Sequence, residues 1–340
     1  MKRNTFLDFM KGVLIILVVL GHSIQHGSGY AFLENRFYDN IVVRFICSFH
    51  MPLFMAIAGY FSYFSFQKYD VKKYILRRFG ALVPVIFSWG IITFTLHCFK
   101  HHSITIDVLG GYLLSLWFLW ALLVASFIIP LTEKYTKGVL KIITYAVILI
   151  LAFITPDNYN WNLYKFMLPC FLLGFYTAKF KWYNYLKSFY WYITGAVIWV
   201  LLIPLFTDNA YIYISGFSLV YSKLSAATQF SIDMFRYIIA LAASVAVLGG
   251  GYILIKFYGK RGEYPRLIKW TVYCGKYSLA IYILSSLQLS VLYTLTSSLH
   301  QSYLLNLFET LIIVIICLAV RKIIGISKIA ARILLAERGN

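Results

Sequence analysis

Long hydrophobic runs recur along the whole chain, separated by short polar segments. Each run is about 20 residues long, the length that a helix needs to cross a hydrocarbon core of about 30 Å. This pattern predicts an all-α, polytopic membrane protein with about ten transmembrane helices. The predicted spans are residues 7–27, 41–65, 79–98, 108–130, 139–155, 162–180, 189–207, 232–257, 270–298 and 303–325.

The composition fits a membrane setting and a single domain. Of the 340 residues, 61% are hydrophobic and 13% are charged, and the mean hydropathy is +0.76. Soluble domains carry about 25% charged residues. Because no Gly/Ser-rich linker or internal repeat divides the sequence, we expect one integral-membrane domain over residues 1–340. The five cysteines stand singly in predicted spans, so we predict neither a disulfide framework nor a bound metal.

The formal net charge of +19 would suggest nucleic-acid binding in a soluble protein. Here most Lys and Arg residues fall in segments that the predicted spans place on one side of the membrane, including residues 68–78, 256–269 and 321–338. Cytoplasmic loops carry such an excess of basic residues. We therefore predict that both termini are cytoplasmic, and nucleic-acid binding becomes unnecessary as an explanation.

Two histidines lie inside the first two predicted spans, where ionisable groups are rare. His22 stands in the first span and His50 in the second. On a helix, Asp8, Lys11 and His22 share one face through their spacing. Titratable residues within a membrane usually line a cavity, a relay or a substrate path. We therefore expect this face to point inward and to support chemistry within the membrane.

Other polar and aromatic residues lie near predicted outer helix ends. Those that could bind a polar ligand beside the histidines are Arg44, Lys165, Arg236, Glu309, Trp117 and Trp120. The cations would also lie there if they only extended their charge to the membrane surface, and tryptophan is common at interfaces. Glu309 has more need of a partner, and Arg236 is a candidate. His97, His101 and His102 lack a carboxylate at metal-ligand spacing, and we assign them no role.

The longest predicted outer loop covers residues 208–231 and is both aromatic and polar. Aromatic side chains favour the membrane interface. We expect this loop to form an interfacial segment or a lid over an outward-facing cavity.

Five short motifs are distributed over most of the chain. They are Asn4-x3-Asp8-x2-Lys11-Gly12 with Val18-Val19-Leu20-Gly21-His22-Ser23; Phe49-His50-Met51-Pro52-Leu53-Phe54 with Ala58-Gly59-Tyr60; Arg77-Arg78 before Leu82-Val83-Pro84; Leu116-Trp117-Phe118-Leu119-Trp120; and Gly275-Lys276-Tyr277-Ser278-Leu279-Ala280-Ile281-Tyr282. The set resembles the integral-membrane acyltransferase type 3 family and, within it, the fucose 4-O-acetylase-like sugar acetyltransferases. In that family a basic residue precedes an essential histidine by eleven positions, as Lys11 precedes His22.

The chain departs from the family pattern at two positions. Many relatives have Arg-x-x-Arg before the Leu-x-Pro, whereas Ala81 stands at the second arginine here, so that Arg77 or Lys73 would have to substitute. Relatives often place a histidine where this chain has Ser285. The first departure bears on the donor site, and the second on a polar contact in the penultimate helix.

The resemblance implies an enzyme of the bacterial inner membrane. It implies transfer of an acetyl group from cytoplasmic acetyl-CoA to a hydroxyl of a cell-surface polysaccharide, glycolipid or lipid-linked sugar. It implies that His22 acts as a general base or is itself transiently acetylated, while His50 orients His22, binds the acceptor or stabilises charge. The residues expected to hold the donor are Asp8, Lys11, Lys73, Arg77 and Arg78. Those expected to hold the acceptor are Arg44, Trp117, Trp120, Arg236 and Glu309.

Three alternatives remain open at the level of sequence. A secondary transporter of a sugar-like or anionic solute would also bury titratable residues, although it would often show internal repeats. A non-catalytic sensor or assembly subunit is a further alternative. The basic residues assigned to the donor could instead serve only to orient the protein in the membrane. Coenzyme A-dependent acetylation would separate the enzyme from the other two classes.

Overall fold

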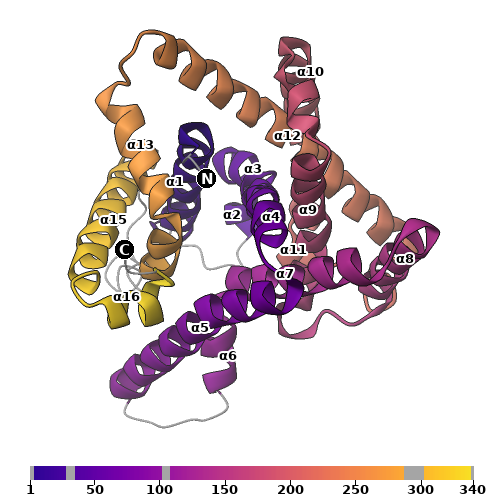
Figure 1. Cartoon of the computed structure of the whole chain (residues 1–340), viewed down its shortest axis with the longest axis horizontal. Helices are drawn as coiled ribbons and strands as arrows, with labels where there is room; N and C mark the ends of the chain where they lie inside the picture. Colours follow the sequence, from indigo (N-terminus) through magenta and orange to yellow (C-terminus); the bar gives the residue numbers. More distant parts are fainter. Residues whose placement is uncertain (1–3, 28–34, 102–107, 287–301, 338–340) are drawn as a thin grey trace. The chain divides into compact units, whose positions relative to one another are not determined.

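A computed structural model describes residues 4–27, 35–101, 108–286 and 302–337 of the chain. Within these ranges the regular structure is entirely helical (Figure 1). Six of the described helical segments are long and apolar enough to cross a membrane. They are Thr5–Gln25, Ile41–Lys68, Val71–Lys100, Trp117–Tyr135, Ala226–Lys260 and Tyr303–Ile324. The all-α fold predicted from the sequence is therefore confirmed over the described residues, and the six long apolar helices are consistent with a multi-pass membrane protein.

The α-helices carry the labels of Figure 1. The first part of the chain forms α1 (Thr5–Gly27), α2 (Asn35–Asp39), α3 (Ile41–Cys47), α4 (His50–Lys68), α5 (Val71–His101), α6 (Leu109–Leu114), α7 (Trp117–Tyr135), α8 (Gly138–Ile154), η2 (Asn158–Asn160) and α9 (Trp161–Lys179). The second part forms η3 (Trp182–Lys187), α10 (Phe189–Leu202), η4 (Ile203–Leu205), η5 (Asp208–Ala210), α11 (Ile212–Ser215), α12 (Ala226–Lys260), α13 (Arg266–Lys276), α15 (Tyr303–Ile324) and α16 (Lys328–Leu335).

The predicted span 41–65 is divided between α3 and α4 by a turn at Ser48 and Phe49. Pro52 explains the break, because proline lacks an N–H and its ring clashes with the carbonyl four residues earlier, here that of Ser48. The Ser48 hydroxyl donates to the Phe45 carbonyl at 2.8 Å and accepts the indole N–H of Trp199 at 2.9 Å. The break places His50 at the first residue of α4.

Other predicted spans also differ in detail. Span 108–130 is divided into α6 and α7, so that Trp117 begins a helix. Span 270–298 contains a turn at Tyr277, and its residues from 287 onward lie outside the described residues. Spans 139–155 and 189–207 correspond to the shorter apolar helices Gly138–Ile154 and Phe189–Leu205. The number of ten spans and the orientation remain predictions.

The chain divides into two compact units. The first comprises Met1–Phe54, Tyr183–Tyr211 and Met234–Ile323, and the second comprises Met55–Trp182, Ile212–Asp233 and Ile324–Asn340. The prediction of one functional domain over residues 1–340 remains a prediction.

In the first unit, α1 and α13 cross at two glycines. A Cβ added to Gly12 would lie 1.9 Å from the Thr271 carbonyl oxygen, and one added to Gly275 would lie 1.7 Å from that of Asp8. In membranes, small residues at helix interfaces let the backbones approach closely. Gly12 and Gly275 belong to the first and last motifs of the sequence, so these two motifs meet in the fold.

The first unit also contains a buried cluster in which α2, α3, η4 and η5 meet α1 and α12. Its members are Ile24, Phe37, Tyr38, Val43, Ile203, Phe206, Ala210, Tyr211 and Ile239. The Tyr211 hydroxyl donates to the Tyr38 carbonyl at 3.0 Å. Burial raises the pKa of the Tyr211 phenol above its usual value. Hydrophobic packing thus holds the short elements α2, α3, η4 and η5 together.

The second unit has a glycine crossing of the same kind, between α4 and α9. Gly59 faces the Phe171 carbonyl and Gly174 faces the Ala56 carbonyl, each with no room for a Cβ. In the same unit, α7, α8 and α9 meet at the buried Glu133. Its carboxylate accepts bonds from Lys141 at 3.1 Å and from Tyr176 at 2.6 Å. Because Lys179 and Tyr145 also donate to it, this carboxylate ties three helices together.

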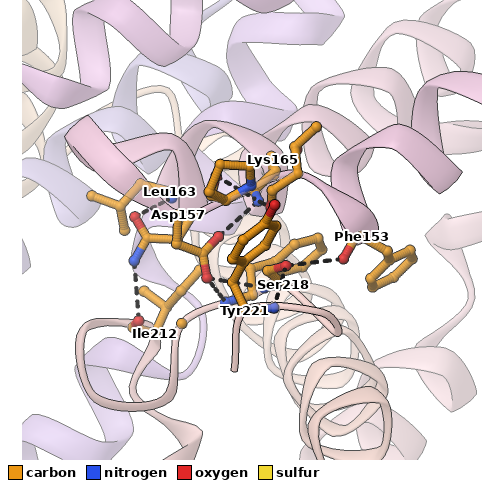
Figure 2. Close-up of polar contacts among 12 residues, drawn as sticks. Phe153, Asp157, Leu163, Lys165, Ile212, Ser218 and Tyr221 are labelled. Carbon is orange, nitrogen blue, oxygen red and sulfur yellow. Dashed lines mark hydrogen bonds and ion pairs between the residues drawn. The ribbon is translucent and has the colours of Figure 1, made fainter. Parts of the chain in front are cut away.

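The segment after α11 is anchored in the second unit by a half-buried carboxylate. Figure 2 shows Asp157 between Lys165 and the backbone of residues 217–218. Asp157 Oδ1 lies 2.7 Å from Lys165 Nζ, and Oδ2 accepts the N–H groups of Phe217 at 2.7 Å and Ser218 at 2.9 Å. Gly216 has φ +73°, and a Cβ there would lie 2.5 Å from Oδ2. Lys165 therefore has a structural partner, and this part of the predicted lid is firmly held.

Candidate functional site

His22 lies on α1, less than two turns before the end of the helix. Its Nδ1 lies 3.1 Å from Oε1 of the buried Gln25, three residues later on the same helix face. Because a carbonyl oxygen only accepts hydrogen bonds, this contact places the proton of the neutral imidazole on Nδ1. Nε2 then carries a lone pair, as a proton acceptor requires.

His50 is held in a similar way at the first residue of α4. Its Nδ1 donates to the Ile46 carbonyl oxygen at 2.7 Å, one of the carbonyls left over where α3 ends. The break between α3 and α4 therefore supplies the acceptor that fixes the His50 tautomer. His50 Nε2 also carries a lone pair.

The two histidines belong to the same unit and interact. Their imidazoles lie within electrostatic range of each other, so that their charged forms would repel. Repulsion of this kind favours a site with at most one charged imidazole. The sequence placed these histidines in successive spans, and the structure places both in the first unit.

Asp8 and Lys11 form an ion pair on α1, with 2.8 Å between Asp8 Oδ1 and Lys11 Nζ. The Asp8 side chain is buried and lies where α13 crosses α1 at Gly275. Lys11 is eleven residues before His22, about 16 Å along the helix, so the pair does not reach the imidazole. Asp8 and Lys11 therefore lie in the first unit but outside contact with His22.

A polar face of α15 meets α1 one residue after His22. The Thr310 hydroxyl donates to Ser23 Oγ at 3.3 Å. Asn306 lies one turn before Thr310 on α15, and Glu309 lies three residues after Asn306, on the neighbouring turn. Among the described residues, Asn306 Oδ1 and Glu309 Oε2 are buried oxygens without a hydrogen-bond partner. The expected pair of Glu309 with Arg236 is not formed in the described part of the structure.

Arg44 and Arg236 are committed to backbone carbonyls in the first unit. Arg44 donates to the Tyr38 carbonyl at 3.1 Å and pairs with Asp39 at 2.7 Å. Arg236, which is buried, donates to the carbonyls of Asn209 and Ala210, each at 2.9 Å. These contacts hold η5 and the end of α2, and they favour a structural role for both guanidinium groups.

The basic residues expected to bind the donor gather around two tyrosines in the second unit. Lys73 Nζ lies 5.6 Å and Arg77 Cζ 4.4 Å from the centre of the Tyr69 ring. Arg78 lies over Tyr74 at 5.4 Å and donates to its hydroxyl at 3.3 Å. We call Lys73, Arg77, Arg78 and the two tyrosines the α5 basic cluster. The cluster lies at the start of α5, one of the longest helices. Basic side chains with several hydrogen-bond donors suit phosphate groups.

The remaining candidates have local partners. The Trp120 indole donates to the Leu113 carbonyl at 2.9 Å, whereas Trp117 packs edge-on against Phe118. Ser285, where relatives often have histidine, donates to the carbonyl of Tyr282 at 3.2 Å within its own helix. His97 packs against Tyr112, and His102 lies outside the described residues. Over the described ranges, no three His, Cys, Asp or Glu side chains cluster as metal ligands would.

Sequence reasoning missed several residues that the structure adds to the site. Gln25 and Asn306 are neutral amides and drew no attention among apolar neighbours. Each nevertheless lies three residues from a candidate, Gln25 after His22 and Asn306 before Glu309. The rule that residues three or four apart share a helix face would have found both.

Comparison with known proteins supports the resemblance that the motifs suggested. Residues 4–321 match the model of the acyltransferase domain of the type 3 family. The chain is 33% identical over 188 residues to nodulation protein NolL of Sinorhizobium fredii, covering 52% of this chain and 50% of that protein. It is 30% identical over 199 residues to nodulation protein NolL of Mesorhizobium japonicum, covering 54% of this chain and 50% of that protein.

These relatives limit how much can be carried over. The chain spans about half the length of the curated relatives it matches. No solved structure matches it. The family match, by contrast, extends over nearly the whole sequence and includes all five motifs. The chain therefore belongs to the type 3 acyltransferase family of membrane proteins.

Proposed function

We propose that this protein is a membrane O-acetyltransferase that moves an acetyl group from cytoplasmic acetyl-CoA to a hydroxyl of a cell-surface polysaccharide, glycolipid or lipid-linked sugar. The observation that carries the proposal is the fixed tautomer of His22. Its Nδ1 is held by Gln25 Oε1 at 3.1 Å, which leaves Nε2 to accept a proton. An orienting hydrogen bond on one ring nitrogen and a basic lone pair on the other are what general-base acyl transfer requires.

In the proposed reaction, His22 Nε2 takes the proton of the acceptor hydroxyl as its oxygen attacks the thioester carbonyl carbon. The new C–O bond forms, the C–S bond breaks, and the coenzyme A thiolate leaves with a proton returned by the imidazolium. An acetylated His22 would use the same nitrogen. A burst of free coenzyme A in the absence of acceptor would indicate that covalent route.

His50 is assigned to the acceptor side of the reaction. Its own Nδ1 is bound to the Ile46 carbonyl, so Nε2 can accept a hydrogen bond from a second hydroxyl of the sugar. Repulsion between two charged imidazoles favours charge on only one of them at a time, and we assign that charge to His22.

The α5 basic cluster is assigned to the phosphates of the donor. Arg77 and Lys73 sit beside Tyr69, and Arg78 sits beside Tyr74. Arg77 would stand in for the second arginine that Ala81 replaces. The Asp8–Lys11 pair is assigned to the cytoplasmic part of the donor path. Among the acceptor candidates, Glu309 keeps a buried unpaired oxygen, whereas Arg44, Arg236 and Trp120 have backbone partners; Trp117 remains a candidate for stacking on a sugar ring.

The test is transfer of radiolabel from acetyl-CoA to surface glycan in membranes that carry the wild-type chain, His22→Ala or His97→Ala. The His97 variant is a matched control, since His97 packs on Tyr112 and has no assigned role. We expect transfer by the wild-type and His97→Ala chains and none by His22→Ala at equal expression. Normal transfer by His22→Ala would refute the role of His22. Solute uptake without any acetylation would replace the proposal with a transporter.

A further inference from the structure

The face of α15 that contacts α1 is polar in an otherwise apolar helix. Leu304 is 79% exposed and Phe308 is 60% exposed, as expected for side chains in contact with lipid. Asn306, by contrast, is only 2% exposed, and Thr310 is fully buried. The contact of Thr310 Oγ1 with Ser23 Oγ fixes this face against α1, at the level of His22.

Two oxygens on this face have no described partner. Asn306 Oδ1 and Glu309 Oε2 are both buried and unpaired in the described residues. Buried polar atoms in native proteins are almost always hydrogen-bonded, so unpaired atoms need an explanation. Their spacing of three residues puts them on neighbouring turns, with about 5–6 Å between the Cβ atoms.

The chemistry of the two oxygens selects the ligand. The amide oxygen of Asn306 and the carboxyl oxygen of Glu309 can both accept hydrogen bonds. The partners they lack are therefore donors, and taking an anionic ligand into a buried site is costly unless a cation pairs with it. A neutral polyol such as a sugar offers several hydroxyl donors at this spacing.

We propose that Asn306 Oδ1 and Glu309 Oε2 form a hydroxyl-binding site that holds two hydroxyls of a neutral carbohydrate acceptor beside His22. The inference rests on the proposed function and deepens it, because it names the contacts and the charge class of the acceptor. Ser23 and Thr310 position the site by joining α1 to α15 at the next residue after His22. Asn306 and Glu309 touch the acceptor but take no part in proton transfer.

The test measures acceptor and donor kinetics separately in purified protein. The acceptor probe is surface glycan from the expressing cells, freed of its acetyl groups by mild alkali, and the donor is radiolabelled acetyl-CoA. The variants are Asn306→Ala, Asn306→Asp and Glu309→Ala. Leu304→Ala is the matched control from the lipid-facing side of the same helix. Size-exclusion elution in detergent establishes that each variant is folded.

We expect Asn306→Ala and Glu309→Ala each to raise the apparent KM for the glycan about 10-fold, the effect of losing one hydrogen bond to a bound hydroxyl. The KM for acetyl-CoA should stay within about twofold for both. Asn306→Asp retains an acceptor oxygen, so it should keep a glycan KM closer to wild type. Leu304→Ala should behave as wild type.

The outcomes separate the inference from the proposed function. If the wild-type protein transfers acetyl groups and the folded variants keep a wild-type glycan KM, or change the two KM values equally, the hydroxyl-binding site is refuted and the acetyltransferase stands. The site is also refuted if an anionic glycan competes as well as a neutral one. If the wild-type protein transfers nothing to the glycan, the proposed function fails and the inference fails with it.

Discussion

His22 Nδ1 and Gln25 Oε1 lie 3.1 Å apart on one face of α1, a turn from each other. This contact decides which imidazole nitrogen carries the proton, because the amide oxygen can only accept. Gln25, a neutral residue three positions further along α1, therefore leaves Nε2 of His22 as the nitrogen that reacts in the proposed mechanism.

Replacing Gln25 by leucine should lower kcat for acetyl transfer about 10- to 100-fold, because the imidazole loses the acceptor that holds its tautomer. Gln25→Glu keeps an oxygen at the same place and should recover most of that loss. Steady-state kinetics at saturating donor and acceptor would measure both. A Gln25→Leu enzyme as active as wild type, or a Gln25→Glu enzyme no better than Gln25→Leu, would contradict the positioning role.

The glycine crossing of α1 and α13 should not tolerate even one methyl group. A Cβ at Gly12 would lie 1.9 Å from the Thr271 carbonyl oxygen, so Gly12→Ala should separate the helices and cost about 2 kcal/mol or more. Gly250 on α12 has nothing within 4 Å of an added Cβ. Gly250→Ala should be neutral or stabilising by about 1 kcal/mol, since alanine favours a helix. Thermal unfolding in detergent compares the two, and equal Tm values would refute the crossing.

The ion pair of Asp157 and Lys165 should matter far more than that of Asp39 and Arg44. Lys165 is only 4% exposed, and Asp157 also accepts two backbone N–H groups. Asp157→Ala should therefore cost about 3–5 kcal/mol, because it leaves a buried cation uncompensated.

Asp39→Ala serves as the comparison for the Asp157 variant. The Asp39 side chain is 64% exposed, so its pair is screened by solvent. Its loss should cost about 0–1 kcal/mol. The midpoints of thermal unfolding for the two variants would measure the difference, and similar midpoints would show that the pair at Asp157 is not a structural anchor.

The α5 basic cluster should set the affinity for the donor. Arg77→Ala and Arg78→Ala should each raise the KM for acetyl-CoA about 10-fold and weaken its dependence on salt, since each removes a charge-assisted contact to phosphate. Lys328→Ala changes a basic residue of the same unit outside the cluster and should leave the KM unchanged. Equal effects of all three variants would indicate that only the overall positive charge matters.

Hydrophobic run length predicted where the long helices lie, because burial in lipid depends mainly on composition over about 20 residues. It did not predict the breaks at Ser48 and Ser115, which depend on proline sterics and on local hydrogen bonds. The pairing of Gly12 with Gly275 could not be predicted from the hydrophobic pattern either. Periodicity shows which residues share a helix face, but it does not show which helix that face contacts. Both glycines were nevertheless present in the motifs.

The candidate site was also only partly predictable from the sequence. His22, His50, Asp8 and Lys11 stand out in the sequence because charge within a membrane span is costly. Arg236 stood out for the same reason, yet the structure commits it to loop carbonyls. Which polar residues are satisfied by the fold and which are left for a ligand depends on tertiary contacts, and a single sequence does not show these.

The last helix has a practical consequence for handling the protein. The Trp89 indole of α5 donates to the Leu334 carbonyl of α16 at 2.7 Å, so the C-terminal helix is docked on the inner part of a long helix and does not trail from it. Shortening the chain by a dozen residues would strip a buried indole N–H of its acceptor. A cleavable purification tag is therefore better joined through a spacer after residue 340 than in place of α16.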